Sequence, residues 1–145
     1  MNSVLRFETF SDEETRALGR ELASRLPQRG VVLLTGDLGA GKTTLSKGFV
    51  EGRGAARAED VSSPTFTIIH EYGDPVSVYH VDLYRLDTAE EARRLGLEDL
   101  FDQPAIVLVE WGERFPEVLP QERIEIRIRH AGEDKREIEV AGLET

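Results

Sequence analysis

Residues 36–43 combine three glycines with a lysine and a threonine, in the order Gly-Asp-Leu-Gly-Ala-Gly-Lys-Thr. Because glycine has no β-carbon, this backbone can take left-handed turns and bring its N–H groups close to a polyphosphate. Lys42 adds a charge that reaches the β- and γ-phosphates, and the Thr43 hydroxyl can bind magnesium. The pattern is a Walker A loop and predicts a site for a nucleoside triphosphate with magnesium, formed by Gly36, Asp37, Leu38, Gly39, Ala40, Gly41, Lys42, Thr43 and Thr44.

The segments on either side of this loop are the ones that such a site requires. The apolar run Val31-Val32-Leu33-Leu34 precedes it and is typical of a strand covered on both faces of a parallel sheet. Residues 43–51 follow it with helical composition, and the start of a helix offers unpaired N–H groups and a partial positive charge. The alternative is a glycine-rich turn that caps a helix and leaves Lys42 in solvent, but such a turn does not need the lysine and the threonine together.

A second apolar run, residues 105–109, is followed at once by Glu110. Because the carboxyl ends of parallel strands meet at one edge of a sheet, Glu110 is the first candidate for an acid that holds magnesium or orients water. Asp82 ends another strand-like segment and is the second candidate, although an aspartate that caps the next turn explains it equally well. Trp111 either stacks near this site or packs beneath it.

Three further polar residues, Thr65, His70 and His80, are of types that can carry out chemistry. Thr65 follows Ser62-Ser63-Pro64 and could contact the γ-phosphate as part of a switch, but ordinary turn chemistry explains the same residues. His70 and His80 are interpreted as structural, since no cluster of zinc ligands accompanies them.

The other elements follow from capping and alternation patterns. Ser11 to Glu14 predicts a capping box that opens a helix ending at Pro27, and Asp87 with Glu90 predicts a cap for a helix over residues 88–95. The remaining predicted elements are an edge strand (4–10), a mobile loop (55–63) and two hairpins (66–72 with 76–83, and 123–129 with 136–140). Together they predict one α/β domain over residues 1–145, similar to a P-loop NTPase, with a central, mainly parallel sheet, antiparallel hairpins and flanking helices.

Composition limits the partners. The chain has 28 acidic and 18 basic residues and a net charge of −10, so it does not produce the long-range positive field that attracts nucleic acid. We therefore do not expect this chain to hold nucleic acid by itself. The absence of cysteine excludes disulfides and thiolate catalysis. No apolar segment approaches membrane-spanning length and no leader pattern is visible, so we expect a cytoplasmic protein without a membrane partner.

Four segments, in this order and at this spacing, resemble the TsaE (YjeE) family of small bacterial P-loop ATPases: GDLGAGKTT (36–44), SPTFT (63–67), HVDLYRL (80–86) and VEW (109–111). The resemblance implies an ATPase that uses ATP and Mg²⁺ in the threonylcarbamoyladenosine modification of transfer RNA. It also implies that the partners are the TsaB and TsaD proteins, that TsaC supplies the carbamoyl donor, and that transfer RNA is met only through the complex.

The same resemblance implies roles for individual residues. Lys42 holds the phosphates, Thr43 and Glu110 bind magnesium, and Asp82 supports hydrolysis. Thr65 acts in the switch, Trp111 flanks the site, and the adenine is contacted by Ser11 or Thr15.

Other classes of function stay open at this point. A small-molecule kinase would use the same loop but usually has an arginine-rich lid, and no compact one is visible. A GTP-driven switch is less favoured because the guanine-reading Asn-Lys-x-Asp motif is absent. A module that binds nucleotide without hydrolysis is the third alternative. The leading hypothesis is magnesium-dependent hydrolysis of ATP that drives a partner complex. We expect the chain to hydrolyse ATP slowly in the absence of its partners, since no obvious arginine finger lies beside the loop.

Overall fold

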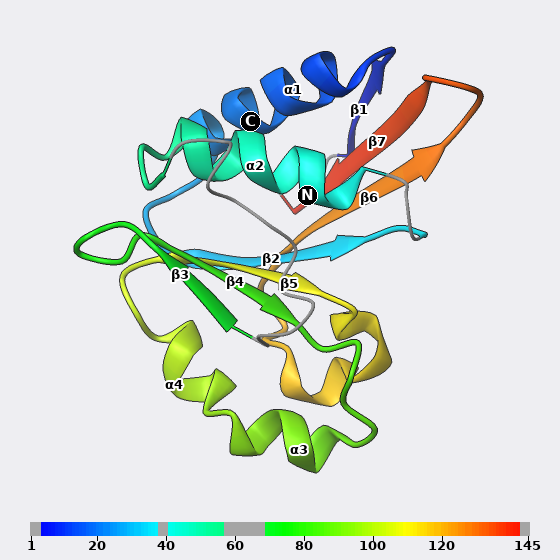
Figure 1. Cartoon of the computed structure of the whole chain (residues 1–145). Coiled ribbons are helices and arrows are strands. Elements are labelled where there is room, and N and C mark those ends of the chain that lie inside the picture. The colour runs from blue at the N-terminus through cyan, green and yellow to red at the C-terminus, as the bar shows by residue number, and fades with distance from the viewer. Residues whose placement is uncertain (1–3, 38–40, 57–68, 143–145) are drawn as a thin grey trace.

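The computed structural model describes residues 4–37, 41–56 and 69–142, and a seven-stranded sheet runs through this part of the chain (Figure 1). The strand order is β1-β7-β6-β2-β5-β4-β3. The strands are β1 (Val4–Thr9), β2 (Gly30–Thr35), β3 (Ile69–Tyr72), β4 (Val78–Asp82), β5 (Ile106–Glu110), β6 (Ile124–His130) and β7 (Arg136–Ala141). The helices are α1 (Asp12–Arg25), α2 (Lys42–Gly52), α3 (Ala89–Arg94) and α4 (Leu97–Phe101), with 3-10 turns η2 (Gly112–Arg114) and η3 (Pro116–Val118).

The centre of the sheet is parallel and its margins are antiparallel. Strand β2 pairs in parallel with β5 and β6, and β4 pairs in parallel with β5. The pairs β3 with β4, β6 with β7 and β1 with β7 are antiparallel, so both predicted hairpins are present. The α/β class predicted from the sequence is confirmed.

Helices cover both faces of the central strands (Figure 1). Helices α1 and α2 pack on one face, where Leu22 and Phe49 join the inward-facing side chains of β2 and β6 in one core. The short helices and turns that follow β4 and β5 pack on the other face around Leu83 and Leu97. Because β2 and β5 are buried from both sides, they carry apolar runs in place of an alternating pattern.

The helix starts agree with the prediction in one case and correct it in the other. The Ser11 side chain accepts a hydrogen bond from the Glu14 backbone N–H at 3.0 Å, as predicted for α1. The cap of α3 is Thr88, whose backbone is extended, and the capping box closes with Glu91. The prediction of Asp87 and Glu90 was therefore wrong by one position, because either register satisfies the same spacing rule.

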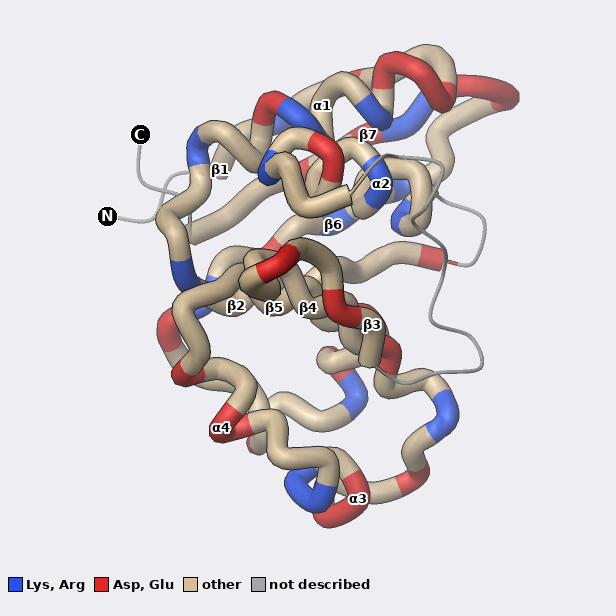
Figure 2. Tube along the Cα trace, turned by 60° about the vertical axis from the view of Figure 1, so that its left-hand side comes forward, with Lys and Arg blue, Asp and Glu red and all other residues tan. Residues whose placement is uncertain are grey.

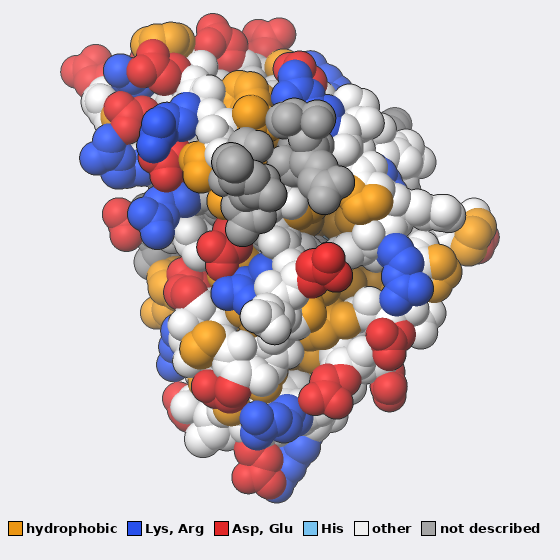
Figure 3. Space-filling model, turned by 180° about the vertical axis from the view of Figure 1, so that it is seen from behind, with side chains coloured by type: hydrophobic (Ala, Val, Ile, Leu, Met, Phe, Trp, Pro, Cys, Tyr) orange, Lys and Arg blue, Asp and Glu red, His pale blue; other side chains and the backbone are white. Residues whose placement is uncertain are grey.

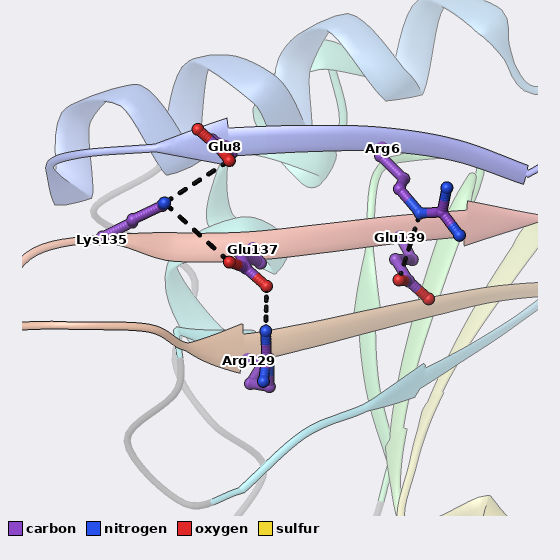
Figure 4. A network of polar contacts seen from close by, with 6 residues as sticks. All are labelled: Arg6, Glu8, Arg129, Lys135, Glu137 and Glu139. Carbon is purple, nitrogen blue, oxygen red and sulfur yellow. Dashed lines mark hydrogen bonds and ion pairs between the residues drawn. The ribbon is translucent and has the colours of Figure 1, made fainter.

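The margin formed by β1, β7 and β6 exposes one face to solvent, and charged side chains of these strands and of the turn before β7 pair on it (Figure 4). The pairs are Arg6 with Glu139 at 3.4 Å, Glu8 with Lys135 at 3.5 Å, Lys135 with Glu137 at 4.0 Å, and Glu137 with Arg129. Hydrogen bonding from the Arg129 guanidinium lowers the pKa of Glu137. Ion pairs in such solvent-accessible positions contribute little to the stability of the fold.

Charges of both signs are interspersed along the described chain (Figure 2) and over the back of the molecule (Figure 3). Within the described residues, no helix is both long enough and apolar enough to cross a bilayer.

Candidate active site

The ends of three parallel strands bring the candidate residues to one edge of the sheet. In the pairing of β5 with its neighbours, Glu110 stands opposite Leu34 of β2 on one side and Asp82 of β4 on the other. Strand β2 ends at Thr35, so the loop that follows it begins at Gly36, two residues beyond the point at which both acids are in register. This is the edge where ligands bind in open α/β sheets.

Both ends of the predicted phosphate loop adopt backbone conformations that require glycine. Gly41 caps α2 with φ +108°, in the left-handed region. Gly36 passes so close to β6 that a β-carbon on it would lie 2.5 Å from the Ile128 carbonyl oxygen. Asp37 follows it, whereas Leu38, Gly39 and Ala40 lie outside the described residues.

Lys42 is the first residue of α2, and its ammonium lies inside the protein. The residue is 6% exposed, and Nζ lies 3.9 Å from Glu110 Oε1 and 4.2 Å from the centroid of the Trp111 ring. Nζ has no hydrogen-bond partner among the residues that the structure describes. A buried ammonium with unused donors is costly unless a ligand completes its shell, so Lys42 fits a phosphate group.

Glu110 is held between two nitrogen-bearing side chains. It is 3% exposed, and its Oε2 lies 2.5 Å from Nε2 of His80, which is fully buried. Its other oxygen faces Lys42. The interaction of His80 with Glu110 was not predicted from the sequence, where His80 was interpreted as structural. A polar residue inside an otherwise apolar strand was the available signal, but its partner becomes visible only from the register of β4 with β5.

Asp82 is the last residue of β4 and stands opposite Glu110 in the pairing of β4 with β5. Burial raises the pKa of Asp82, and the negative charge of Glu110 raises it further. A hydrogen bond from the Tyr84 backbone N–H to Oδ1 at 2.9 Å lowers the pKa, as do His80 and Lys42, but burial dominates. A carboxyl whose proton is held more tightly than usual suits a role in placing or accepting a proton from water.

Trp111 has φ +64° and is the one non-glycine residue with positive φ in the described part of the chain. This conformation costs roughly 1 kcal/mol or more, and such strain clusters at functional sites. It turns the indole toward Lys42, and the ring also packs against Tyr84 with centroids 5.1 Å apart. Trp111 therefore contacts the Lys42 ammonium directly.

The residues expected near the adenine lie on the α1 side of the loop. Thr15 is buried, and its hydroxyl is 2.6 Å from the Thr9 hydroxyl, while Ser11 caps α1. A β-carbon at Gly41 would lie 4.0 Å from Thr15 Cγ2 and 3.8 Å from Arg136 Nε. No sequence pattern singles out Arg136, whose proximity depends on β7 lying beside β1.

Three threonines were predicted to bind the nucleotide or its metal, or to act in a switch. Thr43 and Thr44 are half-buried in the first turn of α2. Thr65 lies outside the described residues. Within the described residues, no group of three or more His, Asp or Glu side chains could hold a metal ion by itself. Magnesium at nucleotide sites is commonly bound by one or two protein oxygens together with phosphate oxygens.

A cavity of about 360 Å³ opens beside the start of the phosphate loop. It is lined by Thr35, Gly36, Asp37, Trp111, Glu113, Arg127, Ile128 and Arg129. A larger cavity of about 550 Å³ is lined by Gly30 and Ile124, the first residues of β2 and β6, and so lies at the edge of the sheet away from the phosphate loop. That larger cavity contains none of the predicted site residues, so size does not identify the site here.

Comparisons with known proteins identify the family of this chain. The model of the family "Threonylcarbamoyl adenosine biosynthesis protein TsaE" matches residues 9–138. A tRNA threonylcarbamoyladenosine biosynthesis protein TsaE from Bacillus subtilis (strain 168) is 48% identical over 135 residues, which cover 92% of this chain and 83% of the relative. The protein of the same name from Treponema pallidum (strain Nichols) is 34% identical over 137 residues, covering 94% and 100%.

A solved structure shows the same fold. The chain titled "Crystal structure of Bacillus subtilus YdiB" superposes with a TM-score of 0.80 at 41% identity, covering 99% of this chain and 88% of that one. Fold, sequence relatives and family model point the same way: this chain belongs to the TsaE family, whose members take part in threonylcarbamoyladenosine biosynthesis on transfer RNA.

Proposed function

We propose that this protein is a cytoplasmic, magnesium-dependent ATPase that supports threonylcarbamoyladenosine modification by acting on a complex of TsaB and TsaD. The observation that carries the proposal is the buried Lys42 ammonium, which has unused donors at the start of α2 and lies 3.9 Å from a carboxylate of the adjoining strand. A phosphate group would complete the shell of that ammonium.

Each residue at the edge of the sheet has a definite task in this proposal. Lys42 and the N–H groups at the start of α2 bind the phosphates and stabilise negative charge on the transferred group. Thr43 and Glu110 hold magnesium, which supplies further neutralisation of that charge when bound. Asp82 orients the attacking water, and its raised pKa favours holding a proton there.

The charge of the chain supports action on a protein complex. A net charge of −10 opposes direct capture of transfer RNA, but it suits docking onto proteins that hold the RNA themselves. In this view hydrolysis resets the complex, and transfer RNA is met only through TsaB and TsaD.

Phosphate release from ATP tests this proposal. We expect release that requires Mg²⁺ and no added acceptor, and that rises when purified TsaB and TsaD are added. Lys42→Ala should abolish release, whereas the matched variant Lys47→Ala, five residues further along the same helix, should keep it. Phosphate transfer only to an added small molecule would favour a kinase, and a rate unaffected by TsaB and TsaD would refute the partner assignment.

A further inference from the structure

His80 makes a contact that packing alone does not explain. It lies in the middle of β4 with no exposed surface, and its Nε2 is 2.5 Å from Glu110 Oε2. Because the ionised carboxylate only accepts hydrogen bonds, Nε2 carries the proton and donates it. Nδ1 has no hydrogen-bond partner in the described part of the chain, so this one bond orients the buried ring.

The second oxygen of Glu110 stands apart from Lys42. Its distance to Nζ, 3.9 Å, is about 1 Å longer than a charge-assisted N–H···O bond. Opposite charges attract strongly in a buried site, so this separation needs a contact that holds the carboxylate back. The bond from His80 is the described contact that holds the carboxylate on its β4 side.

We propose that His80 is a positioning residue, which holds Glu110 away from Lys42 so that the ammonium stays free for phosphate and Glu110 Oε1 stays free for magnesium. This inference rests on the function proposed above and adds a residue that acts through Glu110. Without the Nε2 donor, the carboxylate would turn onto Lys42 and each group would neutralise the other. Loss of a hydrogen bond that orients a metal-binding carboxylate typically costs 10- to 100-fold in metal affinity or activity.

Two substitutions separate the donor from the ring. In His80→Gln the side-chain amide reaches about as far as Nε2 and can donate to Glu110, whereas in His80→Asn it reaches only as far as Nδ1. The matched control is His70→Asn, because His70 stands opposite His80 in the pairing of β3 with β4 and its Nδ1 bonds to the Tyr72 hydroxyl.

The readout is the factor by which Mg²⁺ tightens ADP binding, measured by titration calorimetry on the full chain with and without the metal. We expect His80→Asn to lower this factor about tenfold, and His80→Gln and His70→Asn to stay within about threefold of the unsubstituted protein. Thermal unfolding of each variant confirms that it is folded before it is titrated.

Equal tightening in His80→Asn and the unsubstituted protein would overturn the inference. Equal losses in His80→Asn and His80→Gln would also overturn it, because ring packing would then matter and the donor would not. Failure of the unsubstituted protein to bind ADP would instead refute the proposed function. If His80→Asn does not fold, NMR of the unsubstituted protein decides: the His80 Nε2 proton must be visible in slow exchange, and its absence would contradict the hydrogen bond.

Discussion

Lys42 and Glu110 form a buried charge pair whose strength can be worked out from the structure. At 3.9 Å and an effective dielectric constant of about 20, their attraction is roughly 4 kcal/mol. Glu110→Gln keeps an oxygen that can accept from His80 but leaves the Lys42 charge without its carboxylate. Breaking one side of a buried pair typically costs about 3–5 kcal/mol. We therefore expect Glu110→Gln to lower the free energy of unfolding by about 3 kcal/mol.

A double-mutant cycle isolates this interaction from other effects of each substitution. The free energy of unfolding is measured in urea for the unsubstituted protein, Lys42→Met, Glu110→Gln and the double variant. We expect a coupling of about 2–4 kcal/mol, because removing the second charge relieves the cost of removing the first.

A second cycle on Arg20 and Glu51 is the control. These side chains approach more closely, to 2.7 Å, but are 41% and 35% exposed, so their coupling should not exceed about 1 kcal/mol. If the Lys42 and Glu110 substitutions are additive within about 0.5 kcal/mol, the buried pair described here does not exist in solution.

Three further predictions follow from individual residues. Gly48→Ala should lower the free energy of unfolding by about 1–3 kcal/mol, because the new β-carbon would lie 1.9 Å from the Arg16 carbonyl oxygen. Urea unfolding measures this change, and an unchanged midpoint would contradict the close contact between α1 and α2. Burial raises the pKa of Asp82, so the folded protein keeps this proton to higher pH than the unfolded chain, and stability should decline as pH rises from the ordinary aspartate pKa through the raised one. Asp82→Asn should remove that decline when the free energy of unfolding is measured in urea at several pH values, and it should lower ATP hydrolysis by about 10²- to 10⁴-fold. If the variant and the unsubstituted protein had the same dependence of stability on pH, burial would not shift the pKa of this carboxyl. Trp111 is the single tryptophan of the chain, and its ring centroid lies 4.2 Å from Lys42 Nζ. Its fluorescence should therefore change when ADP binds that ammonium. Saturable ADP binding in calorimetry with no change in the fluorescence spectrum would contradict this prediction.

The sequence was sufficient to predict the architecture around the phosphate loop. Two uninterrupted apolar runs indicated β2 and β5, and the rule that parallel strands end at one edge placed Glu110 next to the loop. Both rules depend on local pattern and general topology, so they needed no knowledge of side-chain contacts.

Contacts that depend on strand register were beyond the sequence. His80 meets Glu110 because β4 lies beside β5, and Arg136 approaches Gly41 because β7 folds back against β1. The cap of α3 was misplaced by one residue because two adjacent residues satisfy the same capping rule. The switch role of Thr65 stays a prediction, since it lies outside the described residues.

The most direct test of the central claim is a crystal structure of this protein with a non-hydrolysable ATP analogue and Mg²⁺. We predict that Lys42 Nζ will lie within hydrogen-bonding distance of the β- or γ-phosphate and that Glu110 will face the metal from the end of β5. A triphosphate bound elsewhere, for example in the larger cavity at the opposite edge of the sheet, or a Glu110 carboxylate turned away from the metal, would contradict the account.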